Sequence, residues 1–326
     1  MFKQFYNRRG IFVFSDPGGA KGVLAVASGL KREGETDLHI FSDRNYDFYD
    51  DFGFNVTHSD SDLIQEQIEK IKPDYIFTGT SYTSIIEIET LKIATDKKIR
   101  SYAFVDHWTN IKKRFIHQEN IYYPDELWLI DPEASKIALT EGVPEEIIKI
   151  TGNPYHEFLK SWHSLLSKKN LSDILSLKLT DKNKLILYVP EPFSNVGGVE
   201  KYGFDETTIL RTLLELFQKD VPSAILLVKP HPNQKAELLK EVLSKYDPQG
   251  VNSKITDTSH TNNLIYHSDL IIGISSNILI EAQIIGKNII RYCPTGYSDP
   301  LYHLNIGTVV NTINQVHKAI RAQFPG

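Results

Sequence analysis

The sequence is poor in cysteine, with Cys293 as the single thiol among 326 residues. One thiol excludes an intrachain disulfide and any metal site built from several thiolates. This usage fits a reducing compartment, so we expect a cytoplasmic protein. No apolar run approaches the ~20 residues of a membrane-spanning helix. Near the amino terminus the apolar run covers only residues 11–14, fewer than the ~7 to 15 of a signal-peptide core.

An excess of positive charge is also missing, because 36 Lys and Arg residues stand against 41 Asp and Glu residues, a net charge of −5. We therefore expect no nucleic-acid partner, since such binding needs a broad basic surface. A peripheral membrane contact through a local patch stays open. Hydrophobic residues make up 41% and charged residues 24% of the chain, which is the balance of a folded protein with a sizeable core.

Short apolar runs alternate with helical patterns along nearly the whole chain, which is typical of parallel α/β folds. Most of the runs are apolar throughout, as strands buried on both faces are. Strands are expected at 11–15, 37–41, 74–78, 101–105, 126–130, 148–151, 185–189, 224–228, 254–256, 270–274 and 288–292. Helices are expected at 21–33, 61–70, 84–95, 132–141, 155–169, 205–219, 235–245, 262–268, 278–285 and 315–324.

A turn-forming break at residues 152–154, Gly-Asn-Pro, interrupts this series. The length also allows two domains at about 100 to 200 residues each. We therefore expect two Rossmann-like domains, residues 1–154 and 155–326, with a cleft between them. Whether the last helix packs back on the first domain stays open.

Ligands of open parallel sheets bind beyond the carboxyl ends of the strands, so the turns that follow the strands are the candidate sites. In the first turn, Gly18 and Gly19 let the backbone approach a ligand, and the helix N–H groups face an anion. A plain tight turn is the alternative. Asp16 is a candidate general base or a helix cap. Asp106 and His107 leave another strand together, but neighbours on extended backbone point in opposite directions, so they need not form one dyad.

In the second half, Ser275, Ser276 and Asn277 place hydroxyl, amide and N–H donors at the positive end of a helix, as a phosphate site requires. Glu281 lies about one and a half turns further along, at ~3.6 residues per turn, where it suits the hydroxyls of a ribose. An ordinary exposed helix glutamate is the alternative. A polar, glycine-containing loop at 191–198 is expected at the same edge.

Another turn, Lys229-Pro230-His231-Pro232, offers two groups that can meet phosphate oxygens, Lys229 as a point charge and His231 as a donor. Metal-site spacings such as HExxH or paired cysteines are missing, and the 11 histidines are dispersed, so no metal is expected. The GxGxxG, Walker and GxSxG patterns are missing as well, which disfavours nicotinamide enzymes, P-loop proteins and serine hydrolases.

Three segments together resemble two-domain glycosyltransferases of the GT-B type. Residues 148–154 are similar to the VTGNP turn of UDP-N-acetylglucosamine 2-epimerases and related GT-B enzymes. Residues 229–232 resemble the KPHP loop of capsule and teichoic-acid transferases such as the CDP-glycerol glycerophosphotransferases. Residues 268–287, with an SS…EA…GK pattern, resemble the nucleotide-diphosphate-binding helix of both groups.

The resemblance implies that Ser275 and Ser276 hold a diphosphate, Glu281 a ribose, and His231 a phosphate or the leaving group. The nucleotide would bind the second domain and the acceptor the first. The CDP-glycerol enzymes carry aspartate where this chain has Glu281, which favours a sugar nucleotide. The His-Arg and Gly-Gly pairs of hydrolysing epimerases are missing, which disfavours epimerase activity.

The expected function is metal-independent and cofactor-free transfer of a sugar from a nucleotide-diphosphate donor to a surface-polysaccharide or glycan-precursor acceptor, including a lipid-linked one. Asp16, Asp106 or His107 would take the acceptor proton. The alternatives are a nucleotide-sugar hydrolase or 2-epimerase, a CDP-alditol phosphotransferase, and a non-catalytic nucleotide-sugar-binding subunit.

Overall fold

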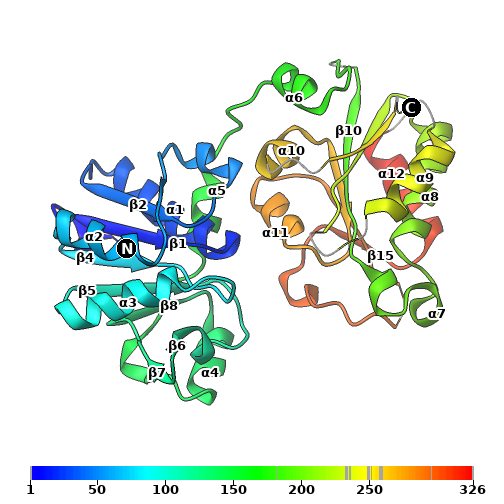
Figure 1. The fold of residues 1–326 in the computed structure, drawn as a ribbon. Coiled ribbons are helices and arrows are strands. Elements are labelled where there is room, and N and C mark those ends of the chain that lie inside the picture. Colours follow the sequence, from blue (N-terminus) through cyan, green and yellow to red (C-terminus); the bar gives the residue numbers. More distant parts are fainter. Residues whose placement is uncertain are drawn as a thin grey trace. The chain divides into compact units, whose positions relative to one another are not determined.

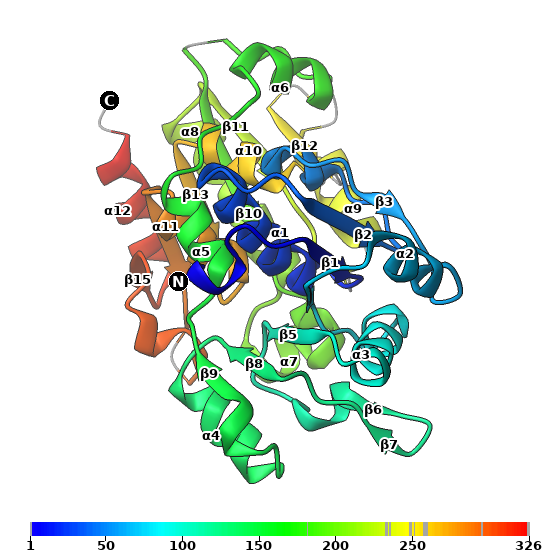
Figure 2. The same cartoon turned by 90° about the vertical axis from the view of Figure 1, so that its left-hand side faces the viewer.

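The computed structural model describes residues 2–180, 182–231, 234, 236–247, 250, 252–256, 260–294 and 296–324. It divides into two compact units, Met1–Ser161 and Trp162–Gly326. Each unit contains a parallel sheet with helices packed on its faces (Figures 1 and 2). The expected fold class of two Rossmann-like sheets is therefore confirmed. Pro232 of the Lys-Pro-His-Pro turn, and Lys235 at the start of an expected helix, lie outside the described residues.

The sheet of the first unit has the order β3-β2-β1-β4-β5-β8-β9, and every pair in it is parallel. Its strands are β1 (Gly10–Phe14), β2 (Leu38–Ser42), β3 (Thr57–His58), β4 (Tyr75–Thr78), β5 (Arg100–Val105), β8 (Glu126–Leu129) and β9 (Ile148–Ile150). Its α-helices are α1 (Pro17–Arg32), α2 (Leu63–Ile71), α3 (Ile86–Lys97), α4 (Pro132–Thr140) and α5 (Pro154–Lys160). Short 3-10 helices are η1 (Lys3–Phe5), η2 (Asp47–Phe52), η3 (Lys112–Phe115) and η4 (Glu145–Ile147), and a small hairpin pairs β6 (Ile116–His117) with β7 (Asn120–Ile121).

Helix α1 packs closely on this sheet because its first half is built from small residues. Pro17 at the first helical position has its φ fixed near the helical value, which favours helix initiation. Gly22 faces the Phe104 ring so closely that a Cβ would overlap with it. The face of the sheet that carries Phe104 is aromatic, with Phe77 against Trp128 at 5.0 Å between ring centroids. The carboxyl end of β1 and the start of α1 are therefore held rigidly.

Helix α5 belongs to the first unit rather than to the second. Phe158 of α5 stacks on Phe52 with 4.3 Å between ring centroids, and the Lys21 ammonium lies 4.7 Å from the centre of the Tyr155 ring. The unit consequently ends at Ser161, after this helix, whereas the sequence placed a domain boundary before it. The single helix expected at 155–169 is instead two helices, because Ser167 caps a new one.

The sheet of the second unit has the order β12-β11-β10-β13-β14-β15 and is also parallel throughout. Its strands are β10 (Lys184–Val189), β11 (Ala224–Val228), β12 (Ser253–Ile255), β13 (Leu270–Gly273), β14 (Ile289–Tyr292) and β15 (Thr308–Val310). Its helices are α6 (Lys168–Leu175), α7 (Gly198–Tyr202), α8 (Glu206–Asp220), α9 (Ala236–Tyr246), α10 (Thr261–His267), α11 (Asn277–Ile284) and α12 (Ile313–Gln323), with 3-10 helices η5 (Phe193–Val196) and η6 (Tyr302–Leu304).

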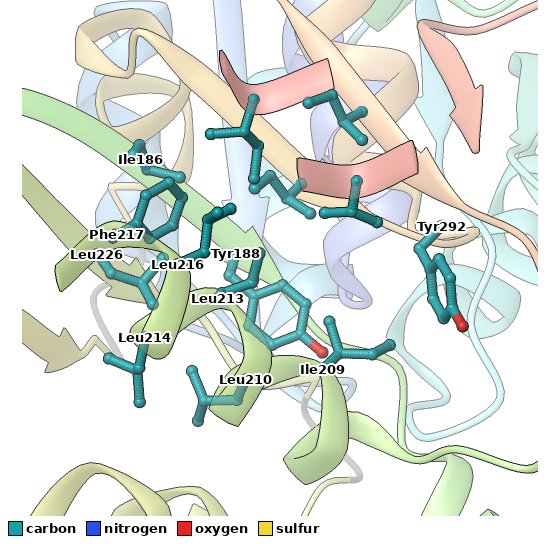
Figure 3. Close-up of a cluster of buried hydrophobic side chains, with 14 of the residues drawn as sticks. Ile186, Tyr188, Ile209, Leu210, Leu213, Leu214, Leu216, Phe217, Leu226 and Tyr292 are labelled. Atoms are coloured by element: carbon teal, nitrogen blue, oxygen red, sulfur yellow. The ribbon is translucent and has the colours of Figure 1, made fainter. Parts of the chain in front are cut away.

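Strand β10 divides the core of this unit into two layers because successive side chains of a strand point to opposite faces. Ile186 and Tyr188 pack with Leu213 of α8 on one face, as Figure 3 shows, and Val316 of α12 joins this layer. Leu187 packs with the other layer, beneath α10 and α11. Both faces are covered, which explains why the strand is apolar throughout. Within the described residues, no helix is long and apolar enough to cross a membrane.

Candidate functional site

The first unit gathers two of the predicted acids at the carboxyl edge of its sheet. Asp16 follows β1 at the N-cap position of α1, but its side chain makes no capping hydrogen bond. Its carboxylate instead accepts a hydrogen bond from the Thr83 hydroxyl at 2.6 Å and one from the Tyr82 backbone N–H at 3.3 Å. Asp16 thus ties the end of β1 to the loop that follows β4. The alternative prediction, that the Asp16 side chain caps α1, is therefore wrong.

Gly18 and Gly19 explain how the loops of this edge come so close together. A Cβ on Gly18 would overlap with Oδ2 of Asp106, the residue that follows β5. A Cβ on Gly19 would lie 3.3 Å from the backbone nitrogen of Thr80, which follows β4. Because Gly18 and Gly19 have no side chains, atoms of neighbouring loops fill the space beside them. The Asp106 carboxylate therefore lies against the start of α1.

Asp106 lies in an environment suited to a general base. Burial raises the pKa of its carboxyl group, and the Arg114 guanidinium, with Nη1 at 3.8 Å from Oδ1, partly offsets that rise. Arg114 is itself held in place, because it donates hydrogen bonds to the Thr80 carbonyl at 3.1 Å and hydroxyl at 3.2 Å. Its guanidinium also lies 4.5 Å from the centre of the Tyr82 ring.

Glu87 is a third acid at this edge, and the sequence interpretation missed it. Its residue is only 3% exposed, and Oε1 accepts a hydrogen bond from the Ser15 backbone N–H at 3.1 Å. Burial is the main cause that raises the pKa of Glu87 to about 8, and the charges of Asp16 and Asp43 add to it. A signal was present, since Glu87 stands between two isoleucines at the apolar start of an expected helix.

His107 does not join these acids. Its side chain is exposed, and Nδ1 lies 3.0 Å from the Thr109 hydroxyl oxygen. Its ring meets Trp108 edge to face, with 5.7 Å between centroids. Of the three candidate proton acceptors in this unit, Asp16 and Asp106 both lie at the first turn of α1. His107 belongs to the outer surface of the same loop.

Two pockets lie on either side of Tyr82 in this unit. The smaller, about 330 Å³, is lined by acids that include Asp43 and Asp60. The larger, about 790 Å³, is lined by residues of η3, among them Arg114. A pocket of the larger size is typical of small-molecule sites.

Among the described residues, no group of three or more His, Cys, Asp or Glu side chains is placed to hold a metal ion.

In the second unit, the predicted phosphate site lies at the turn between β13 and α11. Ser276 caps α11, and its hydroxyl accepts a hydrogen bond from the Ile278 N–H at 3.4 Å. Asn277 is exposed, and the Ser275 hydroxyl is hydrogen-bonded to the Tyr297 hydroxyl at 3.0 Å. The turn therefore presents a helix N-terminus, although Ser276 already serves as its cap.

A protein carboxyl group already faces this turn. Glu191 follows β10, the strand next to β13, and burial raises its pKa. Hydrogen bonds from the Ser275 hydroxyl and backbone N–H act in the opposite direction. An anion that bound at Ser275 would meet Glu191, a contact that only a protonated or displaced carboxyl group permits. The loop at 191–198 was expected at this edge, but this contact was not.

Lys229 and His231 follow β11, which lies on the other side of β10. The Lys229 N–H donates a hydrogen bond to the Tyr188 carbonyl at 2.9 Å, and the His231 N–H donates one to Oε1 of Gln234 at 3.3 Å. The loop after β11 and the turn after β13 therefore start from the same edge of the sheet, with the Glu191 loop between them.

Glu281, the predicted ribose ligand on α11, is only 7% exposed, so it is not an ordinary solvent-facing helix residue.

Arg291 on β14 contacts the backbone just before the β13–α11 turn. The sequence interpretation missed this residue too. It is 1% exposed, its Nε donates a hydrogen bond to the Ile274 carbonyl at 2.9 Å, and Nη2 pairs with Asp299. A buried cation with a carboxylate partner fixes the backbone just before Ser275. The signal was a single arginine inside an otherwise apolar strand.

Solved structures with a similar fold cover almost the whole chain. A putative UDP-N-acetylglucosamine 2-epimerase from Listeria monocytogenes has a TM-score of 0.68 at 14% identity, covering 98% of this chain and 88% of that one. A UDP-GlcNAc 2-epimerase from Neisseria meningitidis, bound to UDP-GlcNAc, has a TM-score of 0.66 at 15% identity, covering 97% and 92%. HepE from Anabaena, in complex with UDP-glucose, has a TM-score of 0.57 at 11% identity, covering 97% and 90%.

At these identities the likeness establishes the fold, which is GT-B-like. No curated protein matches the chain by sequence. One family model matches residues 129–320, more than half of the chain. The chain therefore belongs to the family described as "Protein of unknown function (DUF354)".

Proposed function

We propose that this protein is a glycosyltransferase that moves a sugar from a nucleotide-diphosphate donor to the hydroxyl of a glycan or lipid-linked acceptor. The observation that carries the proposal is the Asp106 carboxyl group, which lies beside Arg114 and against the start of α1, the helix whose N-cap residue is Asp16. A carboxyl group at this edge of the sheet of a GT-B-like fold offers a proton acceptor for the attack of an acceptor hydroxyl.

The donor is assigned to the second unit. Proteins with a similar fold have been solved with UDP, UDP-GlcNAc and UDP-glucose, which supports a nucleotide sugar as ligand. We assign the diphosphate to Ser275, Ser276 and Asn277 at the start of α11, and the ribose to Glu281. Glu191, whose pKa is raised by burial, would in its protonated form donate a hydrogen bond to a phosphate oxygen.

The acceptor and the proton transfer are assigned to the first unit. The acceptor oxygen attacks the anomeric carbon, the bond from that carbon to the diphosphate oxygen breaks, and Asp106 or Asp16 takes the hydroxyl proton. Lys229, His231 and the N–H groups at the start of α11 would stabilise the negative charge on the departing diphosphate. Because these groups supply positive potential themselves, the proposed reaction uses neither a metal ion nor a cofactor.

A second candidate is hydrolysis or 2-epimerisation of the nucleotide sugar. It is favoured by the neighbouring structures that are UDP-GlcNAc 2-epimerases and by the third carboxyl group, Glu87, at the same edge. In hydrolysis, water would take the place of the acceptor. In epimerisation, a carboxylate would remove the proton from C2 of the sugar instead of an acceptor hydroxyl proton. The same nucleotide pocket serves both candidates, so the fate of the sugar separates them.

The test is product analysis with UDP-, CDP-, GDP- and dTDP-sugars, in the presence and absence of glycan and lipid-phosphate acceptors. We expect release of the nucleoside diphosphate to depend on an acceptor, and Asp106→Asn to lower the rate by about 100-fold. Asp96→Asn, at an exposed position of α3, is the matched control. Rapid sugar release or C2 inversion without acceptor would establish the second candidate instead, and no turnover of any donor would refute both.

A further inference from the structure

The larger pocket of the first unit, about 790 Å³, has two walls of different character. One wall comes from η3 and carries three consecutive cations, Lys112, Lys113 and Arg114. The other comes from the start of α3 and from β6 and carries Ile85, Ile88 and Ile116. A pocket lined both by cations and by isoleucines, of which Ile85 and Ile116 are exposed, is suited to a ligand with both an anionic and an apolar part.

The cationic wall retains its positive charge. Among the residues that the structure describes, neither Lys112 nor Lys113 forms an ion pair. Glu141 also lines the pocket, but its Oε2 accepts a hydrogen bond from the Lys112 backbone N–H at 2.8 Å. His117 lines the pocket as well, and its Nε2 lies 2.7 Å from Oε1 of Glu89. Because Arg114 pairs with Asp106, the two lysines and Glu141 set the remaining charge of the lining.

The apolar wall is exposed to an unusual degree for isoleucine. Ile85 is 49% exposed and Ile116 is 44% exposed. Removal of these two apolar side chains from water would favour binding of a ligand that covers them. An inorganic anion would leave these side chains in contact with water. A ligand with a hydrocarbon group beside its charge would cover them.

The pocket is lined by two residues that contact the proposed proton acceptors. Arg114 lines it and lies 3.8 Å from Asp106. Tyr82 lines it as well, and its backbone N–H donates a hydrogen bond to Asp16. A ligand in this pocket would therefore be separated from each carboxyl group by one side chain or loop.

We infer that this pocket binds the acceptor substrate and that the acceptor is an amphiphilic phosphate, with its phosphate on Lys112 and Lys113 and its hydrocarbon on Ile85 and Ile116. Lys112 and Lys113, which form no ion pair among the described residues, match the charge of a phosphate group better than that of a single carboxylate. The role as acceptor rests on the proposed glycosyl transfer. The preference for an amphiphilic phosphate rests on the pocket alone.

Titration calorimetry with octyl phosphate, octyl glucoside and inorganic phosphate, each below any micelle-forming concentration, tests this inference on the full-length protein. We expect one saturable site for octyl phosphate, with an affinity at least about tenfold (~1.4 kcal/mol) above that of either other compound. Lys113→Glu and Ile116→Ser should each weaken octyl phosphate by a similar factor. Lys136→Glu, at an exposed position of α4 in the same unit, should leave its binding unchanged.

Equal affinity for inorganic phosphate would overturn the inference, because the isoleucines would then contribute nothing. Equal affinity for octyl glucoside would overturn it as well, and so would unchanged octyl phosphate binding in both pocket variants. UDP is titrated in the same samples to separate this inference from the proposed function. Octyl phosphate binding at Lys113 without any nucleotide binding would refute the glycosyl transfer but support the pocket, whereas nucleotide binding without octyl phosphate binding would refute the pocket alone.

Discussion

Gly18 shows how a residue predicted to meet a ligand can instead make room for a protein side chain, the carboxylate of Asp106. The sequence indicated a glycine turn open to an anion, but the space beside Gly18 is taken by the Asp106 carboxylate. The sequence could identify the turn because glycine is common there. It could not identify Asp106 as the neighbour of Gly18, because Asp106 follows a different strand, β5.

Gly18→Ala should separate the role of this glycine from simple helix stability. The added Cβ would displace the Asp106 carboxylate, so we expect the rate of sugar transfer to fall by about tenfold to a hundredfold. The melting temperature should change little, because alanine favours helix over glycine. Gly29→Ala on the same helix, where the new Cβ meets only the edge of the Phe2 ring, is the control. Full activity in Gly18→Ala would contradict the role of Asp106.

The position of Glu191 beside Ser275 predicts that nucleotide binding depends on pH. Its ionised carboxyl group would repel a diphosphate at Ser275, and burial places its pKa above the ordinary value. We therefore expect the affinity for UDP to decrease as pH rises through the pKa of Glu191, and Glu191→Gln to remove this decrease. At pH 8 the variant should bind UDP about tenfold more tightly than the wild type.

Glu200→Gln, at an exposed position of α7, controls for the general loss of a negative charge. Calorimetric titrations at several pH values between 5 and 8.5 would measure the effect. A Glu191→Gln variant that binds UDP more weakly than the wild type at pH 8 would show that Glu191 does not compete with the diphosphate.

Helix α3 and strand β1 are joined by a single buried carboxyl group. Glu87 on α3 accepts the N–H of Ser15, at the point where β1 ends. The two residues are 72 positions apart, so no local pattern could reveal the contact. What the sequence did contain was an acid among isoleucines, which conflicts with an apolar helix face and is typical of functional or strained positions.

The pKa of Glu87 predicts a pH dependence of stability. The value rises from 4.5 to about 8 on folding, so the folded protein holds a proton that the unfolded chain releases. The stabilisation is therefore complete below the unfolded pKa and is lost as pH rises to about 8. Wild-type melting temperature should fall by several degrees between pH 5 and 8.5.

Glu87→Gln should flatten this fall, because the amide keeps an acceptor for Ser15 and cannot ionise. Glu66→Gln, at an exposed position of α2, should retain the wild-type profile. Scanning calorimetry across the pH range makes the comparison. Parallel profiles for the wild type and Glu87→Gln would mean that Glu87 is already ionised in the folded protein.

Short or exposed elements were the ones that sequence patterns missed. Strands β3 and β6 contain two residues each, and β15 contains three, of which Thr308 and Val309 are exposed. Such segments carry neither an apolar run nor enough alternation to be recognised. The long apolar strands at the centre of each sheet were recognised because they are covered on both faces.

The whole molecule follows the plan that its alternating pattern predicts, with two parallel sheets and polar turns at their carboxyl edges. The predicted turns after β1, β5, β11 and β13 all lie at such edges. The contacts that hold those turns in place, made by Glu87, Arg114, Glu191 and Arg291, were outside the prediction. They act through contacts between different strands, and those contacts depend on strand order, which the sequence does not state.

Binding of nucleoside diphosphates is the most direct test of the central claim, that the start of α11 in the second unit is a nucleotide site. UDP, CDP, GDP and dTDP are titrated into the wild type, Ser275→Ala and His231→Ala by calorimetry, with melting curves to verify folding. We predict one site for at least one nucleotide, weakened about tenfold or more in each variant. Failure of all four to bind the wild type, or unchanged affinity in both variants, would contradict the account.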